Sequence, residues 1–296
     1  MRRTRPQADA DAAGAVVIAP VLHRLAVMLE AGLTPDRAWQ HLADSGDTTA
    51  RDVCSRRESG LELARAVAAS GGAWRDAASA WQVATTVGAP LARTLRSVAD
   101  ALREAEQTRD DVRVALAEPA ATARLVAWLP LVAVALALVL GFDLGATVTN
   151  PVGAACLVAG ALLMLAARVW TRRLVARAQP SDSVAGLSSE MLAIALSGGV
   201  SIPRAEEVLA TVGVSPGLAD RDVLALSATA GAPAVELLRA TARLERHRAR
   251  VSGRMRAAEL SSRLLLPLGV CTLPAFLLIG VAPMLLSVMA GTPVRL

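Results

Sequence analysis

Hydrophobic positions follow two different patterns along this chain. Between residue 16 and about residue 116 they recur with the helical period; Leu22, Leu25 and Leu29, for example, share one face of a helix. Between Leu125 and Ala167 nearly every position is apolar, and Asp143 is the single charged side chain. No segment alternates with a period of two, so the sequence predicts an all-α protein.

The apolar stretch is long enough to cross a membrane twice. A bilayer core of about 30 Å takes roughly 20 helical residues. Gly145 and Asn150-Pro151 provide a turn near its middle, so we predict a transmembrane hairpin formed by Val126–Gly145 and Val152–Trp170. A buried hairpin in a soluble protein is the alternative, and it would need an unusually large apolar covering.

A second uncharged stretch lies near the end of the chain, from Leu264 to Val294. We predict a third transmembrane helix in its centre, kinked by Pro267, Pro274 and Pro283, as membrane helices tolerate. Arginines flank the hairpin on both sides, whereas its turn has none. The positive-inside rule therefore places the N-terminus in the cytoplasm and the C-terminus outside.

Composition narrows the class of protein further. The chain is 54% hydrophobic with a net charge of +5, and its basic residues are all arginine. A basic chain can bind nucleic acid, but these arginines flank apolar segments instead of alternating with aromatic residues. Membrane topology explains them better, and we expect no nucleic-acid partner. The three cysteines, Cys54, Cys156 and Cys271, have no metal-ligand spacing.

Catalytic chemistry has little support in the sequence. A phosphate-binding loop needs a lysine, and the chain has none. An intramembrane aspartyl protease needs two acids at one site, and the apolar spans contain only Asp143. The histidines show no metalloprotease or triad spacing; they are His23, His41 and His247. We therefore predict no enzyme, no catalytic residue and no bound cofactor or metal.

Four acids on one predicted helix leave two interpretations open. They are Glu104, Glu106, Asp110 and Asp111. They could accept arginine or a metal ion, but an exposed mixture of helical charges is the favoured interpretation.

Two parts of the chain resemble each other. The segment around Gly32 aligns with that around Gly199 at an offset of 167 residues, and Ala38 then falls on Ala205. Further on, Gly88-Ala89-Pro90 aligns with Gly231-Ala232-Pro233 at an offset of 143 residues, so the second copy lacks a segment around Thr48–Gly71. In both copies the second turn precedes a long arginine-rich helix. The predicted structural or coupling turns are Gly32, Gly88, Pro90, Gly199, Gly231 and Pro233.

This duplicated order of leucine-rich helix, glycine turn, helical bundle, Gly-x-Pro turn and membrane helix resembles the type II secretion F-domain family. The compact size and the Arg/Ala bias are most similar to Tad (Flp) pilus proteins of TadB/TadC type. Members often carry a Gly-Glu pair four and three residues before the second turn glycine, where this chain has Ala84-Thr85 and Ser227-Ala228. The resemblance implies a multi-pass platform protein of the bacterial inner membrane. Its implied partners are a cytoplasmic motor ATPase, pilin subunits, a paralogous platform protein, and further copies in a homo- or hetero-oligomer.

The predicted organisation has six parts. They are a tail at 1–15, a first cytoplasmic helical F-type domain at 16–124, a transmembrane hairpin at 125–170, a shorter second F-type domain at 171–263, a third transmembrane helix at 264–290, and an external tail at 291–296. A membrane transporter or channel component is the alternative function. Transporters more often repeat their membrane helices than their cytoplasmic parts, so we favour a platform that couples a motor to pilus assembly or protein secretion.

Overall fold

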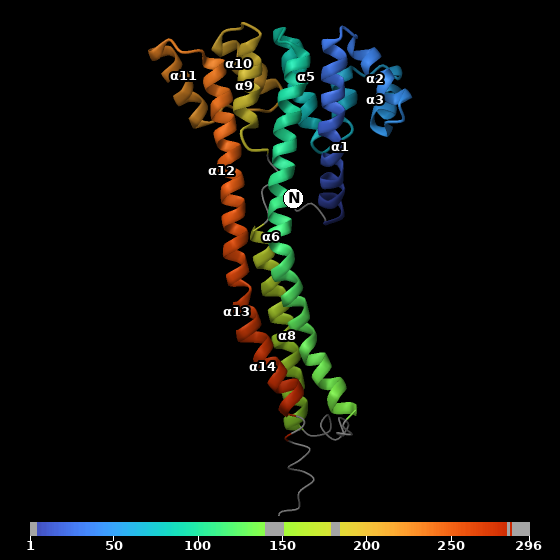
Figure 1. The fold of residues 1–296 in the computed structure, drawn as a ribbon, viewed down its shortest axis with the longest axis vertical. Helices are drawn as coiled ribbons and strands as arrows, with labels where there is room; N and C mark the ends of the chain where they lie inside the picture. The colour runs from blue at the N-terminus through green and yellow to red at the C-terminus, as the bar shows by residue number, and fades with distance from the viewer. Residues whose placement is uncertain (1–4, 140–150, 179–183, 283–284, 286–296) are drawn as a thin grey trace, which may run out of the picture. The chain divides into compact units, whose positions relative to one another are not determined.

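The computed structural model describes residues 5–139, 151–178, 184–282 and 285 (Figure 1). The described residues contain helices and no strand, which confirms the all-α prediction. The chain divides into two compact units. The first unit combines residues 1–108 with 181–250, and the second combines residues 109–180 with 251–296.

The first unit begins with a block of short helices. These helices are α1 (Arg5–Glu30), α2 (Pro35–Asp44), α3 (Thr48–Glu58), α4 (Leu63–Ala68), α5 (Trp74–Val87) and the start of α6 (Leu91–Val139). The apolar face predicted for α1 is buried at Leu22 and Leu25. Trp39 of α2 and Trp74 of α5 lie with their ring centroids 6.0 Å apart in the same core.

A second block of helices completes this unit. It comprises α9 (Leu187–Ser197), α10 (Ile202–Thr211), α11 (Leu218–Ala230) and the start of α12 (Ala234–Arg263). Helix α9 packs against α10 of its own block and against α5 of the first block. Every residue from Ser189 to Ala195 is therefore buried, and the apolar side chains of the two blocks form one continuous core.

The second unit is built around α8 (Pro151–Ala178), which packs against the C-terminal helical segment. That segment continues from α12 through α13 (Leu265–Pro267), η1 (Leu268–Thr272), α14 (Leu273–Phe276) and η2 (Leu277–Val281), where η denotes π-helix. The π-helical turns accompany Pro267 and Pro274, because proline lacks the amide that an α-helix needs at that position. Gly160 allows the close packing, since a Cβ there would collide with Ile279.

Apolar side chains remain exposed in regular stripes on the helices of the second unit. On each helical segment they are spaced three or four residues apart, as one helix face requires. They are Trp128, Val132, Leu136 and Val139 on α6; Val158, Leu162, Leu165 and Val169 on α8; and Leu266, Val270, Leu273 and Leu277 in the C-terminal segment. Continuous exposed apolar surface of this kind is typical of a membrane or protein interface.

Among the described residues, one helix is long and apolar enough to cross a membrane, Pro151–Val175. It contains the second predicted span, Val152–Trp170. The described part of the first predicted span ends with α6 at Val139; the predicted turn at 146–151 lies outside the described residues except for Pro151, which begins α8. The described apolar helix of the third span is shorter, Gly269–Val281. The first and third spans therefore stay predictions.

Candidate functional site

The predicted glycine turns adopt matching backbone conformations in the two blocks. Gly32 follows α1 with φ +89°, and Gly199 follows α9 with φ +80°. Gly88 ends α5 with φ +73°, and Gly231 ends α11 with φ +66°. These left-handed values favour glycine because they carry a steric penalty for other residues. All four glycines therefore end helices for the same conformational reason.

The residues next to these turns also correspond. Both following helices have a proline in their first turn, Pro35 in α2 and, one position later in the alignment, Pro203 in α10; the aligned Ala38 and Ala205 are both buried. This correspondence extends the sequence alignment to local structure.

The prolines of the second turn immediately precede the long helices. The carbonyl of Pro90 accepts hydrogen bonds from the amide and the hydroxyl of Thr94, at 3.0 and 3.1 Å. The carbonyl of Pro233 accepts the amide of Leu237 at 3.2 Å. Both prolines thus occupy the position at which the first intrahelical hydrogen bond begins.

The two blocks meet where α5 and α9 end. Gly198, beside the predicted turn residue Gly199, lies against Val87, beside the predicted turn residue Gly88. A Cβ at Gly198 would overlap the carbonyl of Val87 and lie 2.9 Å from the Cβ of that valine. The structure therefore brings two of the predicted turns together, and only glycine fits at position 198 without a shift. We call this α5–α9 contact the block junction.

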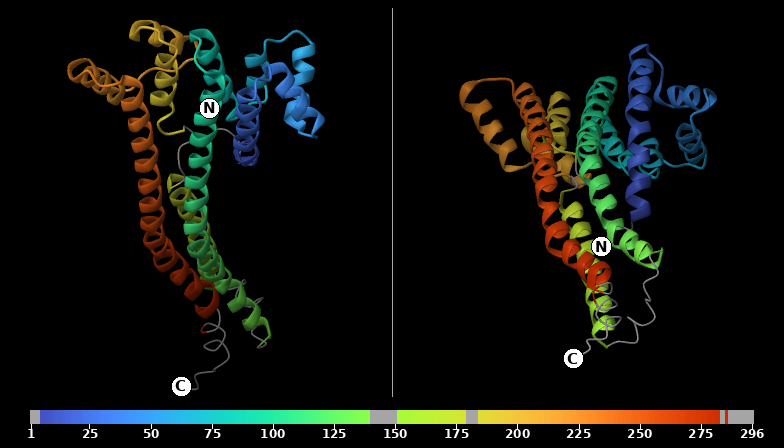
Figure 2. Two further views of the ribbon diagram at one scale, coloured as in Figure 1. Left: turned by 45° about the horizontal axis from the view of Figure 1, so that its top comes forward. Right: turned by 60° about the horizontal axis from the view of Figure 1, so that its bottom comes forward.

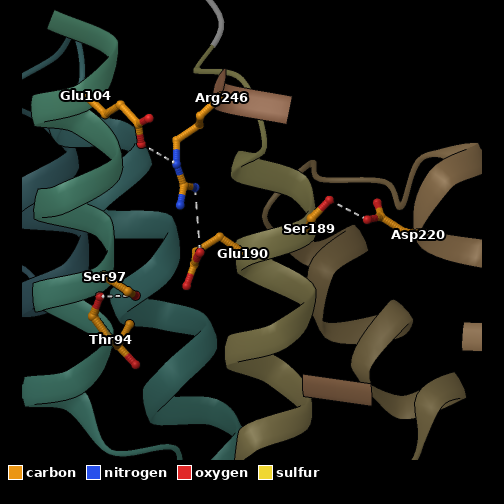
Figure 3. Close-up of polar contacts among 7 residues, drawn as sticks. All are labelled: Thr94, Ser97, Glu104, Ser189, Glu190, Asp220 and Arg246. Atoms are coloured by element: carbon orange, nitrogen blue, oxygen red, sulfur yellow. Dashed lines mark hydrogen bonds and ion pairs between the residues drawn. The ribbon is translucent and has the colours of Figure 1, made fainter. Parts of the chain in front are cut away.

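A buried charge cluster crosses the same pair of blocks (Figure 3). Arg246 of α12 is 9% exposed, and its Nε donates to Oε2 of Glu104 on α6 at 2.8 Å. Its Nη1 lies 3.7 Å from Oε2 of Glu190 on α9, which is 3% exposed. No hydrogen bond is made by Nη1 within the described part of the chain, so Glu190 and Arg246 attract each other mainly as charges. The cluster joins the long helix of the first block to two helices of the second.

A third acid lies close to this cluster. Asp220 of α11 is buried; it accepts the hydroxyl of Ser189 and the amide of Gly217, the latter at 2.7 Å (Figure 3). Burial raises the pKa of the neighbouring Glu245 carboxyl, and the charge of Asp220 raises it further, while Arg248 and Arg246 oppose the shift. The region thus concentrates negative charge around one buried guanidinium.

This arrangement can hold helices together, and it lacks the parts of an active site. Covalent catalysis needs a nucleophile beside a general base; the hydroxyl of Ser189 lies beside the Asp220 carboxylate, but both side chains are buried and out of reach of a substrate. Within the ranges that the structure describes, no group of three or more His, Cys, Asp or Glu side chains is placed to hold a metal ion. The chemical role that the geometry supports is electrostatic attachment of α9 and α12 to α6.

One cavity is resolved in the first block, with a volume of about 270 Å³. Its lining includes Arg56, Ser70 and Trp74. The Nη1 atom of Arg56 donates to the hydroxyl of Ser70 at 2.9 Å and to the carbonyl of Ala66 at 3.2 Å. These bonds give Arg56 a structural role in joining α3 to the end of α4.

Sequence reasoning found only part of the charge cluster. Glu104 is an arginine acceptor, and Glu106 is buried, so the exposed mixture of charges that the sequence favoured is wrong for this part of α6. In the second unit Asp111 accepts Arg254 at 2.9 Å. Glu190 was missed, although it is the single charged residue in the apolar α9. A charged residue in a helix that is apolar on all sides needs a buried partner.

No curated protein matches the chain at a significant level. Residues 21–139, less than half of the chain, match the model of the family described as type II secretion system (T2SS), protein F. The match spans most of the first block and α6, and that stretch is therefore similar to the non-enzymatic inner-membrane platform proteins of secretion and pilus machines.

Proposed function

We propose that this chain is an inner-membrane platform protein that couples a cytoplasmic motor ATPase to the assembly of pilin subunits, in a Tad (Flp) pilus or a type II secretion machine. The family match over residues 21–139 carries this proposal. The exposed apolar stripes of the second unit support it, because a platform protein must be held in the bilayer while its helical domains reach the cytoplasm.

The proposed topology has three membrane spans, with the N-terminus inside and the C-terminus outside. The candidate span in α8 supports the second crossing. The apolar stripe on α6 and the stripe on the C-terminal segment support the first and third crossings, because both expose apolar side chains at the spacing of a lipid-facing helix. The arginines on both sides of the hairpin set the direction.

The proposed organisation also contains a duplicated cytoplasmic domain. The paired glycine conformations support this duplication, as does the order of helices: α1, α2, α5 and α6 correspond to α9, α10, α11 and α12. Helices α3 and α4 have no counterpart, which agrees with the segment that the sequence alignment leaves out. Duplicated helical units are an architectural feature and carry no chemistry of their own.

Coupling needs a connection between the helical blocks and the membrane. Helix α6 is continuous from Leu91, just after the Gly88 turn, into the apolar residues that end at Val139. Helix α12 likewise begins after the Gly231 turn and leads into the C-terminal apolar segment. We infer that the two turns set the direction in which each block meets its long helix, so that movement of a block is passed to the membrane.

The test is the pilus or secretion output of Gly88→Val and Gly231→Val variants in a strain that lacks the native gene. No atom lies within 4 Å of the place that a Cβ would take at either glycine, so the main effect expected of valine is backbone strain at positive φ. Gly46→Val is a matched control, because Gly46 also has positive φ and open surroundings but lies between α2 and α3.

We expect both turn variants to reach the membrane in normal amounts and to lose output, while Gly46→Val retains it. Loss of the turn variants from the membrane fraction would show that the turns serve folding alone. Unchanged output would contradict the coupling role.

A further inference from the structure

Helix α11 is exposed to an unusual degree for a helix rich in apolar residues. Of its thirteen residues only Asp220 and Leu224 are buried, whereas Leu226 is 54% exposed. Figures 1 and 2 show α11 at one edge of the first unit, with α1 to α3 at the opposite edge. A helix with one apolar face uncovered is a candidate surface for a protein partner.

In the first block, the helix that corresponds to α11 has a packing partner within the chain. Helix α5 corresponds to α11, and it packs against α9 at the block junction. There Val83 and Val87 of α5 are buried, and Ile194 of α9 is 2% exposed. Gly198 marks the closest approach, to Val87.

The equivalent residues at the two outer edges are uncovered. The 143-residue offset places Leu226 at the position of Val83 and Ala230 at that of Val87; both are exposed. The 167-residue offset places Val27 of α1 at the position of Ile194, and Val27 is 58% exposed. It also places Ala31 at the position of Gly198, and Ala31 is exposed as well. Each edge thus exposes the residues that correspond to one side of the block junction.

We propose that a second copy of this chain occupies these edges, with α11 of one copy packed against α1 of the next as α5 packs against α9 at the block junction, the helix ends lying slightly further apart. The inference rests on the duplication proposed above and does not depend on the coupling function. The two faces are different, so the contact is head-to-tail, and repetition of it gives a closed ring or an open series of copies.

The closest point of the junction has different residues in the proposed contact between copies. Inside the chain, glycine at position 198 makes room for the larger Val87. Between copies the corresponding pair is Ala31 and Ala230, two methyl side chains of intermediate size. The Cβ of Ala31 takes the place that Gly198 leaves empty inside the chain, so the ends of α1 and α11 must lie slightly further apart than those of α9 and α5, while the smaller Ala230 keeps the approach close.

Disulfide cross-linking in native membranes tests the contact directly. The native cysteines are first replaced by serine, and Ala31→Cys and Ala230→Cys are then made in separate chains and in one chain. At the internal junction the corresponding Cβ positions are 2.9 Å apart. This spacing is shorter than the 3.5–4.5 Å typical of a disulfide, and the slightly wider approach that Ala31 requires brings the equivalent pair into that range.

We expect chains with either single cysteine to stay monomeric after oxidation, and membranes containing both kinds to yield dimers. Chains with both cysteines should give higher oligomers. Dimers from a single-cysteine protein would indicate a symmetric contact and overturn the proposal. Absence of cross-linking in the mixed membranes would also overturn it.

Two surface variants of α11 test which side of this helix makes the contact between copies. Leu226→Arg places a charge at the equivalent of buried Val83, whereas Leu218→Arg places it at the equivalent of the exposed Arg75. Leu218 is 79% exposed, so both variants alter the surface of the same helix. Cross-linked yield per membrane-bound chain should fall at least tenfold with Leu226→Arg and stay unchanged with Leu218→Arg.

The result is independent of secretion, because the experiment works in a strain without the motor ATPase. Equal yields from the two variants would overturn the assignment of this face to a second copy. In a strain that contains the motor, loss of motor binding with Leu226→Arg at unchanged cross-linking would also overturn the proposal and assign the face to the motor.

Discussion

Arg246→Met should destabilise the first unit more than any change to an exposed arginine of the same helix. The guanidinium lies between Glu104 and the buried Glu190. Methionine keeps much of the apolar stem and removes the charge. Glu190 then retains a negative charge in a buried position without its cation, and this unpaired charge is the main cost.

The structure gives the scale of this effect. Removing one partner of a buried ion pair typically costs about 3–5 kcal/mol. For a unit of this size, each 1 kcal/mol lowers the melting temperature by roughly 2–4 °C, so the decrease should be on the order of 10 °C. Double replacement with Glu190→Gln should recover part of the loss, because the neutral amide is less costly to bury.

Tryptophan fluorescence of the purified protein provides the assay. Trp39, Trp74 and Trp81 are buried in the core of the first unit, and Trp128→Phe with Trp170→Phe removes the signal of the second unit. Arg243→Met is the matched control, since Arg243 is exposed on the same helix.

A melting temperature for Arg246→Met equal to that of the control would refute the role of the cluster. Failure of Glu190→Gln to recover any stability would show that the cost arises elsewhere.

Three further predictions concern charge, packing and topology. The folded state raises the pKa of Glu245, so it favours the neutral carboxyl, and stability falls as pH rises from the unfolded-state pKa through the folded-state pKa. Glu245→Gln should therefore have a higher melting temperature than wild type near pH 7 and the same melting temperature below pH 4.5. Gly160→Val should overpack the second unit, reduce its free energy of unfolding by about 1–3 kcal/mol and so lower its melting temperature. Gly269→Ala, at an open position, should have little effect on that temperature. Cysteine at Thr147 should be labelled from the outside of intact cells, and cysteine at Ser183 only after permeabilisation; labelling of the latter in intact cells would contradict the topology.

Much of the helical architecture could be predicted from the sequence, because it depends on local signals. The apolar face of α1 at Leu22 and Leu25 is a matter of spacing along one helix. The left-handed turns at Gly32 and Gly199 follow from the freedom of glycine to adopt positive φ. These features need no knowledge of what packs against the helix.

The charge cluster and the block junction depend on contacts between distant parts of the chain. Glu104 and Arg246 are separated by 142 residues, and nothing in the periodicity of α6 or α12 pairs them. The tight contact of Gly198 with Val87 follows from tertiary packing in the same way. The apolar character of α9 on all its sides was the available signal, since such a helix must be covered on more than one face.

Capture of the motor is the measurement that bears most directly on the proposed function. The chain, carrying an affinity tag, would be purified in mild detergent from its own membranes, and the proteins retained would be identified by mass spectrometry. We expect recovery of a secretion-type motor ATPase with a phosphate-binding loop, together with ATP hydrolysis that disappears when that ATPase is removed. Absence of the motor from the purified complex, or ATP hydrolysis that persists without it, would contradict the role of this chain as a non-enzymatic platform.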